Sequence, residues 1–153
     1  MSVVTVESEA LARLLPEEAE EWTVDDLARM PSDGLRYELF DGVLVVSPAP
    51  YIRHQRASRA LFLLLHEACP PDMEVFYAPI DFQPTTKRSF QPDLLVARSA
   101  DLPVDDDATA ITIPPLLAVE VLSKGSRSLD RIFKREMYAT SGVDNYWIFD
   151  PKA

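Results

Sequence analysis

The chain has one cysteine among its 153 residues, Cys69, and this scarcity excludes an internal disulfide. No cysteines and histidines have the spacing of a structural zinc site. The longest apolar run, residues 60–65, is far shorter than the roughly 20 residues of a membrane-spanning helix. The first 22 residues carry six glutamates and lack the basic start and apolar core of a signal peptide. These absences predict a reducing, cytoplasmic setting.

Positive charge is also scarce, with 15 Lys and Arg against 25 Asp and Glu. A net charge of −10 argues at first sight against a nucleic-acid partner, because contacts from Lys and Arg to phosphate supply most non-specific affinity. The acids are concentrated in residues 1–33, which hold nine acids and two bases. Eight of the 15 bases lie in residues 53–59 and 124–135. These two stretches are either solvated helix faces or a local basic surface for DNA.

Apolar residues make up 47% of the chain, enough for one compact domain without disulfides. We expect an acidic, poorly ordered lead-in over residues 1–21 and a single domain over residues 22–153. The spacing of Thr23 and Asp26 is typical of a capping box, which starts a helix that ends near Pro31. The other predicted elements are strands 37–40 and 43–46 around an Asp41-Gly42 turn, a helix over 53–69, a strand at about 73–80, a turn-rich stretch through Lys87, strands 93–97 and 116–122 separated by a loop over 101–110, a helix from about 126 to 141, and a last strand over 146–149.

Two acids lie inside apolar strand-like runs. Asp93 opens the run 93–97, and Glu120 lies near the end of 116–122. A buried carboxylate costs several kcal/mol unless it is paired, hydrogen-bonded or bound to a cation. If the two strands pair antiparallel, the carboxylates converge, and a divalent metal ion between them explains both. Alternatively, each acid lies at a strand end and bonds a neighbouring backbone group or arginine.

The order of elements resembles the core of the PD-(D/E)XK nuclease superfamily. Six motifs are similar, in order, to those of the Uma-type restriction-endonuclease-like family, and they cover about residues 22–151. They are RYELFDG at 36–42, HQR at 54–56, QPDLLV at 91–96, VEVLS at 119–123, KREMY at 134–138 and GVDNYWI at 142–148. The resemblance implies an α/β fold with a restriction-endonuclease-like core, in which helices flank a mixed central sheet, preceded by an N-terminal helix and a β-hairpin.

The function that the resemblance implies is magnesium-dependent hydrolysis of DNA phosphodiester bonds, with Mn²⁺ as a possible substitute for Mg²⁺. Asp93 and Glu120 would be metal ligands, with the carbonyl of Val121 as a third oxygen. The metal would polarise a phosphoryl oxygen and activate a water. A lysine would orient that water or offset developing charge.

The lysine position departs from the superfamily pattern, because the residue two after Glu120 is Leu122. The family resemblance implies that a lysine on the following helix takes this role, which makes Lys134 the first candidate. On that predicted helix, Lys134 shares a face with Asp130 and Tyr138. Lys124 is the second. An exposed Asp130–Lys134 surface pair is the alternative interpretation.

Further positions match the family motifs. Glu38 would hold a metal-bound water or simply face solvent. His54 would touch phosphate or assist proton transfer, although a lone histidine more often caps or packs. The aromatic residues Tyr138, Tyr146 and Trp147 are expected in the core rather than in base stacking.

Three functions remain open from the sequence. The first is a metal-dependent endonuclease. The second is a catalytically degenerate nucleic-acid-binding or scaffold module, favoured by Leu122 and by the acidic net charge. The third is hydrolysis of a small phosphorylated compound. The chain ends just after Asp150-Pro151, so we expect a naturally short member or a C-terminal truncation, and a homodimer through an exposed strand edge.

Overall fold

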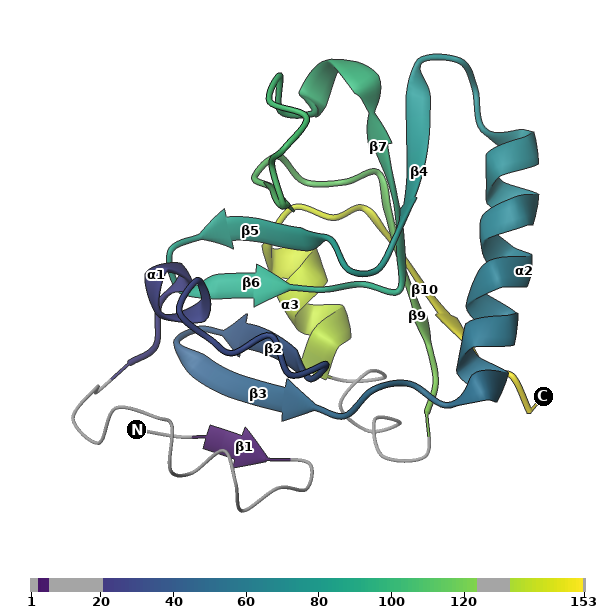
Figure 1. The fold of residues 1–153 in the computed structure, drawn as a ribbon. Coiled ribbons are helices and arrows are strands. Elements are labelled where there is room, and N and C mark those ends of the chain that lie inside the picture. Colours follow the sequence, from purple (N-terminus) through teal and green to yellow (C-terminus); the bar gives the residue numbers. More distant parts are fainter. Residues whose placement is uncertain (1–2, 6–20, 124–132, 153) are drawn as a thin grey trace. The chain divides into compact units, whose positions relative to one another are not determined.

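The computed structural model describes residues 3–5, 21–123 and 133–152 (Figure 1). The chain divides into two compact units. The first consists of Met1–Ala49 with Thr85–Phe90, and the second of Pro50–Pro84 with Gln91–Ala153. No helix among the described residues is long and apolar enough to cross a membrane.

The first unit is built on a hairpin, β2 (Arg36–Phe40) and β3 (Val43–Ser47). Asp41 and Gly42 form its turn with φ angles of 51° and 80°, the left-handed values that this two-residue turn requires. The predicted hairpin is therefore confirmed. Strand β1 (Val3–Thr5) pairs parallel with β3, and β6 (Arg88–Phe90) pairs antiparallel with β2. The core of this unit contains Trp22, Leu39, Leu44 and Val46.

The predicted N-terminal helix is α1 (Val24–Leu27). The carboxylate of Asp26 accepts hydrogen bonds from the backbone N–H and the hydroxyl of Thr23, and these bonds hold the pKa of Asp26 below its ordinary value. The helix ends earlier than predicted, well before Pro31. The N–H groups of Arg29 and Met30 bond carbonyls three residues back rather than four, so the chain tightens into turns after a single helical turn.

The second unit contains a four-stranded mixed sheet with the strand order β10-β9-β7-β4. Its strands are β4 (Met73–Tyr77), β7 (Leu94–Arg98), β9 (Leu117–Val121) and β10 (Asn145–Phe149). The pairs β4–β7 and β7–β9 are antiparallel, whereas β9–β10 is parallel. This sheet confirms the predicted mixed sheet.

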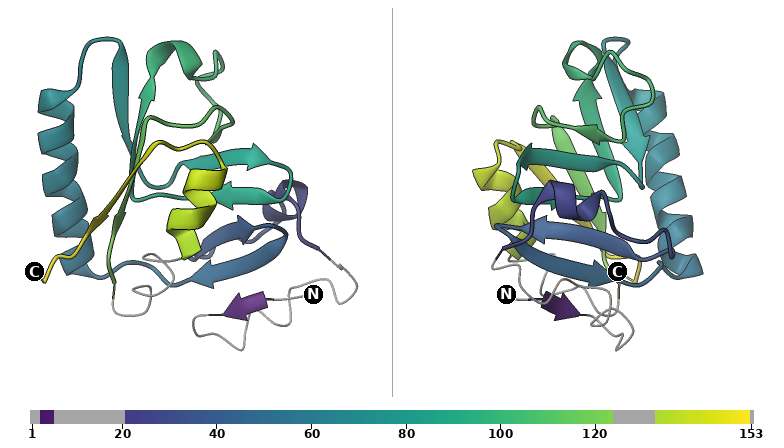
Figure 2. Two further views of the ribbon diagram at one scale, coloured as in Figure 1. Left: turned by 180° about the vertical axis from the view of Figure 1, so that it is seen from behind. Right: turned by 60° about the vertical axis from the view of Figure 1, so that its left-hand side comes forward.

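Helices α2 (Ile52–Ala68) and α3 (Arg135–Thr140) lie on opposite sides of this sheet (Figure 2). The side chains of α2 that face the sheet pack against alternate residues of β7 and β9. The packed residues are Leu61, Phe62 and Leu65 of α2 with Leu94, Val96, Leu117 and Val119 of the sheet. Because side chains alternate along a strand, Ala118 and Glu120 point to the other face, where α3 lies.

The stretch after β4 differs from the prediction. Strand β4 ends at Tyr77, and the residues predicted to be turn-rich carry β5 (Asp81–Thr85). Strand β6 begins directly after that stretch, where no strand was predicted. Pro84 lies beyond the two residues of β5 that pair with β8 (Ala110–Ile111), so it removes no hydrogen bond from that ladder. The predicted loop over 101–110 begins at the short helix η2 (Ser99–Asp101).

Candidate functional site

Of the two acids predicted to converge, Glu120 lies in β9 and Asp93 directly precedes the neighbouring strand β7. In the antiparallel pair β7–β9, Leu94 is opposite Val119, so one residue further Asp93 is opposite Glu120. Side chains of directly opposite residues lie on the same face of a sheet. Asp93 is 3% exposed and Glu120 is 2% exposed. The predicted strand pairing is confirmed, while a separation of about 4 to 6 Å between the carboxylates, which one shared ion would allow, stays a prediction.

Asp93 is held by the backbone of β9 and by the first turn of α2. Its Oδ2 accepts a 2.7 Å hydrogen bond from the N–H of Val121 and lies 3.0 Å from Nε2 of His54. An ionised carboxylate only accepts, so this contact requires a proton on Nε2. His54 is buried, and its Nδ1 lies 3.4 Å from the hydroxyl of Ser58. These contacts fix the orientation of Asp93.

Glu120 is held by residues at the start and in the middle of α3. Its Oε1 accepts hydrogen bonds of 2.9 Å from Nζ of Lys134 and of 2.9 Å from the hydroxyl of Tyr138. Lys134 is 2% exposed, and Tyr138 is fully buried. The two donors are four residues apart, so they share one helix face. The structure therefore brings Lys134 to one of the two predicted metal ligands, whereas Lys124 and Asp130 lie outside the described residues.

Two contacts of this site are not among the sequence predictions. His54 was expected to touch phosphate, assist proton transfer, cap or pack, and the structure shows it bonded to Asp93. Tyr138 was expected in the core; it is buried, and its hydroxyl also bonds Glu120. Its place one helical turn after Lys134 was the available signal. The expectation that Trp147 lies in the core is wrong, because its side chain on the outer strand β10 is 52% exposed.

The donor set suits a hard divalent cation. Among the described residues, no group of three or more His, Cys, Asp and Glu side chains is arranged to hold a metal ion. Mg²⁺ needs no such group, because it binds one or two protein carboxylates and keeps several waters. Asp93 and Glu120 supply two carboxylates, and Val121 adjoins Glu120 with its backbone carbonyl. Metal-binding carboxylates are themselves usually hydrogen-bonded, as both of these are.

Comparison with known proteins assigns the chain to a family. Residues 24–153 match a family described as "Uma2: Putative restriction endonuclease". The chain belongs to the Uma2 family. The matched range includes the residues of the candidate site, Asp93, Glu120 and Lys134 among them. The predicted family is thereby confirmed.

A solved structure also resembles this Uma2 chain. It is described as "a putative nuclease belonging to DUF820" from Anabaena variabilis ATCC 29413, with 19% sequence identity and a TM-score of 0.68. The alignment covers 85% of this chain and 74% of that chain. At this identity the likeness shows a shared nuclease-like α/β fold, which confirms the predicted fold class. The comparison with curated proteins found no match.

The third acid of the family motifs, Glu38, lies on β2 in the first unit. Its side chain is 1% exposed, so the interpretation that it faces solvent is wrong. Holding a metal-bound water, the role that the Uma2 resemblance implies for Glu38, stays a prediction.

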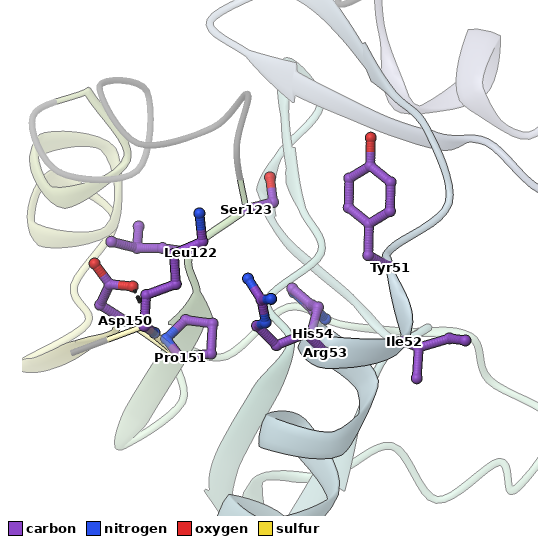
Figure 3. Close-up of a pocket in the computed structure, with 9 residues that line it drawn as sticks. Tyr51, Ile52, Arg53, His54, Leu122, Ser123, Asp150 and Pro151 are labelled. Carbon is purple, nitrogen blue, oxygen red and sulfur yellow. Dashed lines mark hydrogen bonds between the residues drawn. The ribbon is translucent and has the colours of Figure 1, made fainter.

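A cavity of about 470 Å³ opens next to His54 in the second unit (Figure 3). One wall comes from the chain entering α2, and the other comes from the residues that directly follow β9 and β10. The lining residues are Tyr51, Ile52, Arg53, His54, Leu122, Ser123, Asp150, Pro151 and Lys152. Because His54 contributes to the cavity and also bonds Asp93, the cavity adjoins the candidate Uma2 site.

Proposed function

We propose that this Uma2 chain is a metal-dependent endonuclease that hydrolyses phosphodiester bonds of DNA, with Mg²⁺ as its cofactor and Mn²⁺ as a substitute. One observation carries the proposal. Two buried acids, Asp93 directly before β7 and Glu120 in its antiparallel partner β9, lie at the same pair of strands, and a buried lysine bonds Glu120. Such groups are costly to bury, and hydrolysis of a phosphodiester uses all three.

The residues that would hold the metal are Asp93, Glu120 and the carbonyl of Val121. When bound, the ion supplies a Lewis acid for the phosphoryl oxygen and lowers the pKa of a bound water. The hydrogen bonds from Val121 N–H and from His54 keep Asp93 in one orientation. The bonds from Lys134 and Tyr138 do the same for Glu120. His54 is thus a positioning residue for Asp93.

Lys134 supplies the positive charge of the site. Its ammonium lies 2.9 Å from Glu120 Oε1 and is buried. A buried charge interacts with its neighbours more strongly than a charge in water does. In the proposed mechanism it offsets the negative charge that develops on the phosphoryl group. The superfamily lysine position carries Leu122. This buried apolar residue can neither orient the attacking water nor offset the developing charge. In the first unit, Glu38 is proposed to hold a metal-bound water.

The comparisons support this proposal at the level of the family. The Uma2 family is described as a putative restriction endonuclease, and the similar solved chain as a putative nuclease. Both descriptions favour a nucleic-acid substrate. DNA as the substrate, magnesium as the metal and a cytoplasmic setting are our finer proposals.

A homodimer is part of the same proposal. In the described part of the chain, β10 has one neighbouring strand, β9. Its side chains Trp147 and Phe149 are exposed and lie two residues apart, on one face of the strand. An apolar outer strand favours pairing with a second copy. Light scattering of the purified chain tests this, and a monomer at all concentrations contradicts it.

The test of the endonuclease is nicking of supercoiled plasmid DNA by the full chain with Mg²⁺, Mn²⁺ or a chelator. Asp93→Asn and Glu120→Gln should each lower the rate by on the order of 10²-fold or more. Glu74→Gln, which changes an exposed acid on β4 in the same sheet, is the matched control and should leave the rate unchanged. Calorimetric titration with Mg²⁺ gives a readout independent of turnover, in which the two site variants should lose binding.

The degenerate binding module is the second candidate, because Leu122 replaces the expected lysine. It predicts DNA binding that is insensitive to Mg²⁺ and no nicking with any metal. Thermal stability that rises with Mg²⁺ in the parent and not in Asp93→Asn would favour the enzyme.

A further inference from the structure

The cavity next to His54 combines apolar walls with positive charge (Figure 3). Tyr51 and Ile52 lie on one side of it, and Leu122 and Pro151 lie on the other. Arg53 and Lys152 add one cation from each side, against one acid, Asp150, on the wall of Lys152. Its volume of about 470 Å³ falls within the range of roughly 300–1,000 Å³ that is usual for small-molecule sites. A flat ring with a phosphate attached fits this chemistry.

We propose that this cavity binds one unstacked nucleotide of single-stranded DNA, so that the substrate cleaved at the neighbouring carboxylates is single-stranded or locally unpaired. The cleavage part of this inference rests on the proposed function, whereas the binding part does not. Neither the family description nor the similar structure's description specifies such a site.

The apolar walls favour an unpaired base. The ring of Tyr51 is 68% exposed, although it lies at a cavity, and Ile52 beside it is also exposed. Base stacking on an aromatic side chain is a common way to bind single strands, because every base has a π-face. In a duplex both faces of a base are covered by its neighbours. Only an unstacked base can therefore use these walls.

The charges favour a phosphate chain leading into the cavity. Arg53 and Lys152 line it, and the carboxylate of Asp150 accepts a 3.0 Å hydrogen bond from the backbone N–H of Lys152, which orders that wall. Arg56 and Arg59 continue along the exposed part of α2. A positively charged track beside a stacking residue is typical of single-strand binding. This interpretation also accounts for the basic stretch 53–59 in an acidic chain.

The cavity is linked to the candidate metal ligands by direct contacts. His54 lines the cavity and lies 3.0 Å from Asp93 Oδ2. Leu122, on the opposite wall, follows Val121, whose N–H bonds the same oxygen. A nucleotide in the cavity would therefore adjoin the phosphodiester at the carboxylates, and it would position that bond for hydrolysis.

The test is fluorescence anisotropy with a labelled single-stranded oligonucleotide and the same strand annealed to its complement, both in chelator so that no cleavage occurs. The single strand should bind about tenfold or more tightly than the duplex. Tyr51→Ala should lower the affinity for the single strand about tenfold, the usual effect of losing one stacking partner. Arg53→Gln should lower it and weaken its salt dependence.

Two matched controls lie outside the cavity. Tyr77→Ala removes a similarly exposed tyrosine, 65% exposed on β4, and Arg98→Gln removes an exposed arginine at the end of β7. Neither should change the affinity. In the unaltered protein, the methyl resonances of Ile52 should shift on titration with the single strand, which requires no variant at all.

Equal binding of strand and duplex, or equal effects of Tyr51→Ala and Tyr77→Ala, would overturn the inference. The proposed function can fail separately. Binding that depends on Tyr51, without metal-dependent cleavage, would leave the nucleotide site standing and remove the endonuclease. Cleavage of duplex DNA that is unaffected by Tyr51→Ala would support the endonuclease and remove the nucleotide site.

Discussion

Removal of the charge on Lys134 should destabilise the protein strongly. Lys134→Met keeps much of the side-chain volume and leaves the carboxylate of Glu120 buried without its cation, 2% exposed. Breaking a buried ion pair from one side costs about 3–5 kcal/mol. For a chain of this size, about 1 kcal/mol corresponds to roughly 2–4 °C in Tm, so the Tm should fall by roughly 6–20 °C.

The double variant Glu120→Gln with Lys134→Met tests the reason for this loss. It removes both charges together, and replacing a buried pair by neutral groups is often neutral or stabilising. We therefore expect the double variant to recover most of the stability lost in Lys134→Met. The hydroxyl of Tyr138 can still donate to the amide oxygen of the new glutamine.

A double-mutant cycle needs four free energies of unfolding. Thermal and urea unfolding supply them for the parent, Lys134→Met, Glu120→Gln and the double variant. Plasmid nicking by the same samples separates stability from catalysis, because the double variant should be folded and inactive. A Lys134→Met loss below about 1 kcal/mol, or a double variant as unstable as the sum of the singles, would refute the buried-pair argument. Nicking by the folded double variant at the parental rate would remove Lys134 and Glu120 from the mechanism.

The remaining predictions concern individual side chains. Asp93→Asn should abolish Mg²⁺ binding in calorimetry while lowering stability by about 1 kcal/mol, because the amide oxygen can still accept from Val121 N–H; a variant that melts far lower would identify Asp93 as chiefly structural. The pKa of Asp26 lies below its ordinary value of 3.8, so the ionised carboxylate stabilises the first unit at pH values above 3.8. This stabilisation is lost as the pH falls through the lowered pKa. Asp26→Asn should therefore lower stability near neutral pH and flatten the acid limb of the stability curve, followed by Trp22 fluorescence in a Trp147→Phe background; an unchanged acid limb would contradict this. Burial and the hydrogen bond to Asp33 raise the pKa of Tyr37 to about 12, and ultraviolet titration should show a late-ionising tyrosine whose pKa falls in Asp33→Asn but stays above the ordinary value, because burial, the larger cause, remains.

Local sequence signals predicted those elements whose causes are local. The Asp41-Gly42 pair specifies a hairpin turn by its backbone conformation, and the structure has that turn. The helical spacing of apolar residues over 53–69 predicted α2, which runs from Ile52 to Ala68. The apolar run around Glu120 predicted β9, in which every residue is buried.

Elements that depend on distant partners were not predictable in this way. Strand β8 is two residues long and exists because Asp81 and Phe82 pair with it. Strand β6 pairs with β2 at Ser89 and Leu39, which are 50 residues apart in the chain. Prolines near β5 favour turns locally, and the partner strand outweighs that preference.

In the candidate site, too, some features have local causes and others depend on residues distant in the sequence. The antiparallel pairing of β7 with β9 was predicted from two acids in apolar runs, a pattern visible in the sequence, while the separation of the carboxylates of Asp93 and Glu120 stays a prediction. The contact of His54 with Asp93 joins residues 39 apart, and that of Tyr138 with Glu120 joins residues 18 apart. These contacts depend on how α2 and α3 pack on the sheet, which no local pattern specifies. Residue type alone leaves a histidine or a tyrosine as a packing residue in most proteins.

The most direct test of the central claim is a crystal of the full chain soaked in Mn²⁺ and measured at a wavelength where manganese scatters anomalously. The proposed function predicts one anomalous peak within about 2.0–2.2 Å of oxygens from both Asp93 and Glu120, and its loss in Asp93→Asn. A structure at saturating Mn²⁺ with no peak between these carboxylates, and with the bonds of Lys134 and His54 unchanged, would contradict the metal-dependent nuclease and leave the four residues as a buried structural network.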